Sequence, residues 1–229
     1  KIASYVGADP ANSRISNLTS NSFNLKVYED WSKDSEMNHG SEKISYIALT
    51  DGDDRGVIYG SKYEEMFVKS AFGQFAEYGT LSINTDWSTI SLNNDYVDPI
   101  IIASDPTING PDAVTVRLNN ISNNSFDIRL QEPNHLDGLH TFETVSYLAI
   151  ESGDWTFDKN GTKKISAGSI TSNKLTSQGF ETINLSNISS NSYTALSQVQ
   201  TFNGSDWVTT RTKDFGESSF KVSMQEEQS

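Results

Sequence analysis

The chain has 229 residues, a net charge of −13 and no cysteine. The negative charge disfavours nucleic acid and anionic membrane surfaces as partners, because both would repel it. The missing cysteines exclude disulfides and a thiol nucleophile, and no apolar run is long enough to span a membrane. The chain opens on Lys1 and no signal peptide is visible, so we expect that any leader has been removed. An acidic surface suits a salty or calcium-rich extracellular setting, with solubility alone as the alternative, and we expect a secreted or cell-surface protein.

The predicted elements, in chain order, are mostly short strands. Residues 63–72 could form a short helix, and residues 80–92 predict one or two strands. A buried strand follows at 100–102, with Pro99 at its first position. Residues 114–119 and 126–130 alternate apolar and polar side chains on either side of a turn, which predicts an antiparallel hairpin. Residues 145–150 carry apolar side chains on both faces, which is typical of a central strand.

One stretch occurs three times in the chain. It reads ISNLTSNSFNLKVYE at 15–29, LNNISNNSFDIRLQE at 118–132 and TKDFGESSFKVSMQE at 212–226. The aligned phenylalanines Phe23, Phe126 and Phe220 lie 103 and 94 residues apart, a spacing typical of tandem domains. The matches extend further, for example from His39–Leu49 to His140–Ile150.

These patterns predict an all-β chain of tandem antiparallel β-sandwich domains. We expect a partial repeat at 1–52 without its first strands, a complete repeat at 53–152, and a partial repeat at 153–229 without its last strands. We refer to them below as the first, middle and third repeats. Because the outer two are incomplete, we interpret the chain as a segment of a longer repetitive protein.

Catalytic chemistry has little support in the residues. The chain has three histidines and no Gly-x-Ser-x-Gly, so we expect no enzyme activity. His140 and Glu143 are three positions apart, and on one strand they would face opposite sides. They could share a site only if His140 precedes the strand.

A cluster of carboxylates near residue 50 is the candidate metal site. Asp51, Asp53 and Asp54 offer closely spaced oxygen ligands that suit calcium. An acidic turn between domains is the alternative interpretation, and no other cofactor is predicted.

The recurring Asp-x4-Arg pattern is the main candidate site. It occurs as Asp9 with Arg14, Asp112 with Arg117, and Asp206 with Arg211. A carboxylate beside a guanidinium can accept and donate hydrogen bonds to sugar hydroxyls. Trp207 beside Asp206 adds an apolar face on which a sugar could stack. An ion pair that only fixes the loop remains the alternative.

The order of these segments resembles the H-type lectin domain of snail agglutinins and discoidins. The matching segments are 1–49, 100–150 and 194–227, and similar segments also look like tandem repeats of large secreted bacterial proteins. The resemblance implies a six-stranded antiparallel sandwich that binds galactose-type sugars, through Asp112, Arg117 and His140 or its neighbours. The family's tryptophan in the last strand is Tyr147 here, and the polar loop at 132–140 is longer, which puts the sugar specificity in doubt.

The function expected from the sequence is therefore a non-catalytic, extracellular, lectin-like array that binds a glycan or polysaccharide. The alternative is a structural repeat of an extracellular fibre, stalk or adhesin that self-associates into an oligomer or filament through its sandwich units. Repetition favours the first because it raises avidity, and incomplete outer repeats favour the second.

Overall fold

The computed structural model describes residues 1–30, 39–49, 55–62, 73–156, 163–188 and 192–227. Strands dominate these residues, and the one helical element among them is a single 3₁₀ turn, η2 (Thr176–Gln178). The strands are β1 (Ala11–Ser16), β2 (Asn24–Glu29), β3 (Arg55–Lys62), β4 (Gly73–Ile83), β5 (Ser88–Ser91), β6 (Pro99–Ala103), β7 (Thr115–Asn119), β8 (Ser125–Gln131), β9 (Glu143–Glu151), β10 (Gly153–Thr156), β11 (Lys164–Ala167), β12 (Glu181–Asn184), β13 (Val208–Lys213) and β14 (Ser219–Glu226).

The middle repeat is an antiparallel β-sandwich, which confirms the predicted all-β sandwich class, while the tandem arrangement of domains stays a prediction. One sheet has the order β11-β10-β3-β4-β9-β6, and the facing sheet has the order β5-β8-β7. Alternate side chains of β8, namely Phe126, Ile128 and Leu130, are fully buried between the two sheets. They pack with apolar residues of β6, β7 and β9 in one continuous core.

Several strand predictions for this repeat are confirmed. β7 and β8 form the antiparallel hairpin, β9 lies between β4 and β6, and β6 begins at Pro99. The buried Tyr147 of β9 packs edge-on against Phe126 across the sandwich. The predicted helix at 63–72 lies outside the described residues.

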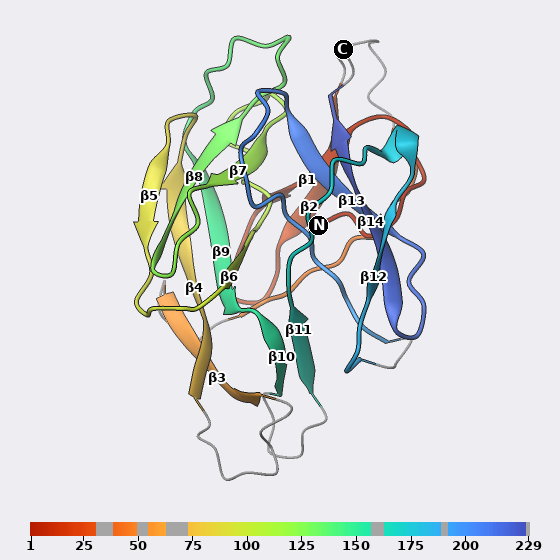
Figure 1. Ribbon diagram of the computed structural model, residues 1–229. Coiled ribbons are helices and arrows are strands. Elements are labelled where there is room, and N and C mark those ends of the chain that lie inside the picture. The colour runs from red at the N-terminus through yellow and green to blue at the C-terminus, as the bar shows by residue number, and fades with distance from the viewer. Residues whose placement is uncertain (31–38, 50–54, 63–72, 157–162, 189–191, 228–229) are drawn as a thin grey trace.

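The three copies of the repeated stretch form three hairpins of the same geometry, β1-β2, β7-β8 and β13-β14 (Figure 1). Their registers correspond: Arg14 faces Lys26, Arg117 faces Arg129, and Arg211 faces Ser223. The residue after each first strand has a positive φ, at Asn17, Asn120 and Asp214. Asn and Asp tolerate this left-handed conformation better than other residues with a Cβ, which explains the residue types at this turn.

The hairpins of the two outer repeats bury their cores less completely than the middle one does. Phe23 and Phe220 are half-buried, whereas Phe126 is fully buried. Among the described residues, the third repeat contributes the sheet β12-β14-β13 and the strands β10 and β11 at one edge of the large sheet, and the first repeat contributes β1-β2. The limits of the repeats at 52 and 152 stay a prediction, because one sheet joins β9 to β10 across the second limit.

The repeats also lie side by side through specific edges (Figure 1). β10 of the third repeat pairs with β3 of the middle repeat. Ile15 at the end of β1 forms a parallel bridge with Thr107 of the middle repeat, and Thr212 of β13 donates a hydrogen bond to the carbonyl of Ile2 in the first repeat. Each repeat therefore touches the other two.

Candidate functional site

The three arginines of the Asp-x4-Arg pattern are buried, not exposed to a sugar. Arg14 and Arg211 have no accessible surface, and Arg117 is 2% exposed. Each guanidinium reaches into a loop of the next repeat: Arg14 into the middle repeat, Arg117 into the third, and Arg211 back into the first. We call these contacts the first, second and third seams. Burial corrects the prediction that these side chains are presented to a glycan.

Glu143 is the centre of the first seam. Its side chain accepts hydrogen bonds from the hydroxyl of Thr107 (2.5 Å), from the main-chain N–H groups of Asn109 and Gly110 (2.8 Å each), and from Arg14 (2.7 Å). Arg14 also donates to the main-chain carbonyl of Asp112. Both partners of this ion pair are fully buried. Because so many donors surround one carboxylate, the burial of its charge is compensated.

His140 completes this network. It precedes β9, so it can share a site with Glu143, and its Nε2 lies 3.1 Å from the Glu143 carboxylate. Its Nδ1 lies 2.7 Å from Glu132 at the end of β8. The buried imidazole thus bridges two carboxylates and is not available to a ligand.

Glu42 repeats this arrangement in the third seam. It accepts hydrogen bonds from the hydroxyl of Ser4, from the main-chain N–H groups of Val6 and Gly7, and from Arg211. His39 again lies between two carboxylates, 3.1 Å from Glu42 and 2.9 Å from Glu29. We call the loops 4–7, 107–110 and 201–204, which align in the three repeats, the cradle loops.

The hydrogen bonds of the cradle loops change the acidity of both glutamates. Burial would raise the pKa of Glu143, but the donors on Thr107, Gly110 and Asn109 outweigh it and the pKa is lowered. The pKa of Glu42 is lowered in the same way, against burial, by Ser4, Val6, His39 and Arg211. Both carboxylates are therefore held in the charged form.

The second seam contains the corresponding arginine, Arg117, but different groups contact its guanidinium. Arg117 donates to the side chain of Gln131 and to the main-chain carbonyl of Asp206 (2.8 Å), and its guanidinium lies over the ring of Phe202, 4.5 Å from the centroid. Its Nε is buried without a hydrogen-bond partner. Burial and the nearby Arg129 lower the pKa of Arg117 to about 10.

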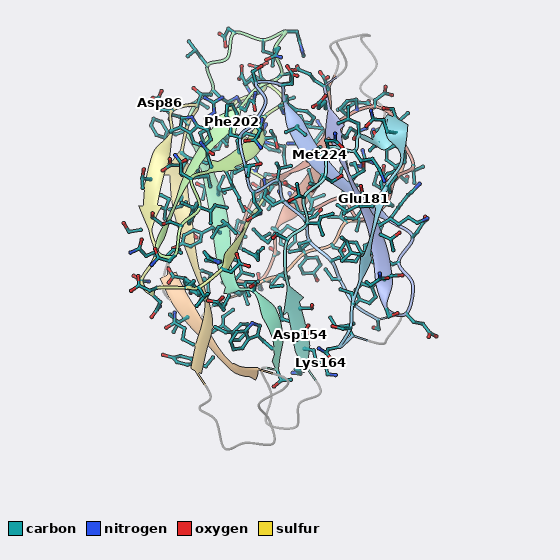
Figure 2. The ribbon with its side chains drawn as sticks, in the orientation of Figure 1. Asp86, Asp154, Lys164, Glu181, Phe202 and Met224 are labelled. Carbon is teal, nitrogen blue, oxygen red and sulfur yellow. The ribbon has the colours of Figure 1, made fainter. Side chains whose placement is uncertain are left out.

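Aromatic pairs accompany the second and third seams at corresponding positions. Trp87 of the middle repeat packs edge-on against Phe202 of the third (5.3 Å), close to the exposed Asp86 (Figure 2). Phe180 of the third repeat packs edge-on against Tyr5 of the first (5.3 Å). These rings add apolar burial to the contact between repeats.

The other predicted site residues do not gather at one place. Trp207 is 1% exposed, so it cannot offer a face to a sugar, and this prediction is wrong. Asp206 is exposed and accepts a hydrogen bond from Asn134, whereas Asp9 and Asp112 are partly buried. Asp51, Asp53 and Asp54 lie outside the described residues. Among the residues that the structure describes, no group of three or more His, Asp or Glu side chains could hold a metal ion.

The glutamates of the two networks were missed as site residues. The signal was present, because His39 with Glu42 matches His140 with Glu143 and each cradle loop ends in glycine. Sequence reasoning paired each arginine with the aspartate of its own repeat. The structure pairs Arg14 and Arg211 with a glutamate of another repeat.

Comparison with known proteins finds a relative. The chain is similar to halomucin of Haloquadratum walsbyi. The two are 30% identical over 151 residues, which is 65% of this chain and 2% of halomucin. No protein-family model matches the chain, and no solved structure matches it. The described residues contain no helix of the length and hydrophobicity that a membrane crossing requires.

Proposed function

We propose that this chain is a structural module of an extracellular or cell-surface protein, in which repeats are fastened to each other by buried arginines. The observation that carries the proposal is the use of Arg14 and Arg211. Each is fully buried against a glutamate of another repeat, so the recurring motif serves contact between repeats.

The similarity to halomucin supports the location. The shared segment is a small part of a much longer protein, which fits a module that recurs within a large chain. Its name describes a mucin, a class of surface or secreted protein. The net charge of −13 supports solubility at a surface exposed to a salty medium.

The location is tested by immunolabelling of intact cells of the source organism, with antibodies raised against the folded chain. We expect surface labelling without permeabilisation, and loss of the label after external protease treatment. Labelling that appears only after permeabilisation would contradict the proposal. An antibody against a ribosomal protein is the control for leakage.

Carbohydrate binding of the H-type lectin kind is the second candidate, favoured by an exposed aromatic and carboxylate pair. Trp87 is 37% exposed and stands next to the exposed Asp86, with the guanidinium of Arg129 5.0 Å from the Trp87 centroid. Such a group can stack on a sugar face and bind its hydroxyls. A glycan array distinguishes it: binding should disappear in Asp86→Ala and persist in Asp127→Ala, and no binding by the native chain would exclude it.

A further inference from the structure

We propose that the second seam is a docking site for a strand that carries His-x-x-Glu, supplied by a further copy of this repeat. The 229 residues contain three arginines of this kind and three cradle loops, but two His-x-x-Glu segments, His39–Glu42 and His140–Glu143. Both segments occupy a cradle loop, so the third loop shows what such a loop presents before a segment binds.

The third cradle loop has the groups that bind glutamate in the other two. Thr201, Asn203 and Gly204 align with Thr107, Asn109 and Gly110, and all three are exposed. Among the described residues no carboxylate contacts the N–H groups of Asn203 or Gly204. Two adjacent N–H groups and a hydroxyl can therefore receive a carboxylate with the geometry of Glu143.

The space around the glycine of each cradle loop also distinguishes the third loop from the other two. A Cβ on Gly110 would lie 2.7 Å from His140 Nε2, and one on Gly7 would lie 2.3 Å from His39 Cε1, whereas one on Gly204 would meet nothing within 4 Å. The glycine leaves room for the imidazole of the incoming segment. At Gly204 that room faces solvent.

Arg117 and Glu226 supply the remaining two contacts. Arg117 is buried and lies at the position from which Arg14 and Arg211 bind their glutamates; its Nε has no hydrogen-bond partner, as is also true of Arg211. Glu226 stands at the end of β14, as Glu132 stands at the end of β8 and Glu29 at the end of β2, and both of those bind the histidine of the network. The glutamate of the incoming strand would thus meet Arg117, and its histidine would meet Glu226.

The surface beside the third cradle loop offers further space. A surface hollow is lined by Gln200 and Thr201 of the third repeat, by Ser169, and by residues 97–100 and 120–123 of the middle repeat. Phe220, Val222 and Met224 of β14 are half-buried, whereas their counterparts in β8 are fully buried. An added strand would cover this apolar surface, as β9 covers β8 in the middle repeat.

The inference deepens the proposed function by naming the partner of one seam. It rests on the interlocked repeats and not on their location, so a failed surface-labelling experiment would leave it standing. A failure of the docking experiment would in turn leave the extracellular location standing.

The test uses the whole chain and a fluorescent peptide of its own residues 135–151, which contain His140 and Glu143. We expect saturable binding by fluorescence anisotropy, with one peptide per chain. A Glu143→Gln peptide should bind at least about tenfold more weakly, because it loses a charge-assisted contact with Arg117. A Glu151→Gln peptide is the matched control and should bind like the native peptide.

Gly204→Val in the protein provides the complementary test. The Cβ of the new side chain meets no atom within 4 Å, so we expect an unchanged melting temperature. The side chain would occupy the position of the incoming imidazole and reduce binding at least about tenfold. The proposal is overturned if the native peptide does not bind, if the Glu143→Gln peptide binds equally well, or if Gly204→Val binds with unchanged affinity. An Arg117→Met protein should lose the discrimination between the two glutamate peptides.

Discussion

The first and second seams contain the same arginine on the same hairpin strand, but they differ in what the arginine meets. Arg14 reaches a carboxylate that is already held by a hydroxyl and two N–H groups, and both charges are buried. Arg117 reaches a carbonyl, an amide and an aromatic ring. Burial lowers the pKa of both arginines. Glu143 opposes the effect on Arg14, whereas on Arg117 the nearby Arg129 adds to it and Asp206 and Glu226 oppose it. The same arginine therefore has a buried carboxylate as its partner in the first seam and neutral acceptors in the second, where the proposed docking of a His-x-x-Glu strand would add a carboxylate.

The largest expected effect is that of Arg14→Met, which breaks the first seam. It leaves the buried Glu143 without its counter-charge, and we expect a loss of about 3–5 kcal/mol in the free energy of unfolding. Urea unfolding followed by tryptophan fluorescence measures it. A loss below about 1 kcal/mol would mean that the seam does not hold the repeats together. The pair Arg14→Met with Glu143→Leu should recover part of the loss.

Gly110→Ala tests the packing of the histidine against the cradle loop. The added methyl would lie 2.7 Å from His140, so we expect a loss of about 1–3 kcal/mol. Gly204→Ala is the matched control in the third repeat and should change stability by less than about 0.5 kcal/mol. Equal effects at the two positions would contradict the difference between the seams.

Acid should weaken the first and third seams. The pKa of Glu143 and that of Glu42 are both lower in the folded protein, so each stabilises the fold above the ordinary pKa of 4.5 and loses this contribution as pH falls towards the folded value. Glu132, whose pKa is raised by burial, acts in the opposite sense. Per carboxyl the slope cannot exceed about 1.4 kcal/mol per pH unit. Urea midpoints measured below pH 5 should show a smaller slope in Glu143→Gln.

Arg117→Met is expected to have the smallest effect. No buried carboxylate depends on Arg117. Removal of its charge relieves repulsion with Arg129 but loses the attraction of Asp206 and Glu226, two hydrogen bonds and the contact with Phe202, so we expect a loss of about 1–2 kcal/mol. The same urea titration measures it beside Arg14→Met. A loss as large as that of Arg14→Met would show that Arg117 already stabilises the contact between repeats as strongly as Arg14 does, without a further partner.

The fold could be predicted from local patterns to a large extent. Alternation of apolar residues identifies β7 and β8, because one face of each strand is buried. Apolar residues on both faces identify β9 as central. The turn between the hairpin strands is also visible, since Asn17, Asn120 and Asp214 occupy the same left-handed position.

For the site, the sequence predicted which residue types take part but not which of them are in contact. The arginines, histidines and glycines all appear in the repeated sequence, but proximity along the chain suggested that Asp112 acts with Arg117. Arg14 and Glu143 are 129 positions apart, and nothing in either segment states that they meet. Trp207 shows the same limit, because its strand position does not tell which face is covered by another repeat.

The sequence by itself therefore determined the local elements: strands, turns and the number of repeated hairpins, which depend on side-chain periodicity and on residues that accept a positive φ. The tertiary structure decided which repeat supplies the partner of each buried arginine. A buried guanidinium needs acceptors from whatever surface covers it, and here that surface belongs to the next repeat around the molecule. Whether a motif binds a ligand or another part of the protein depends on that packing and not on the motif.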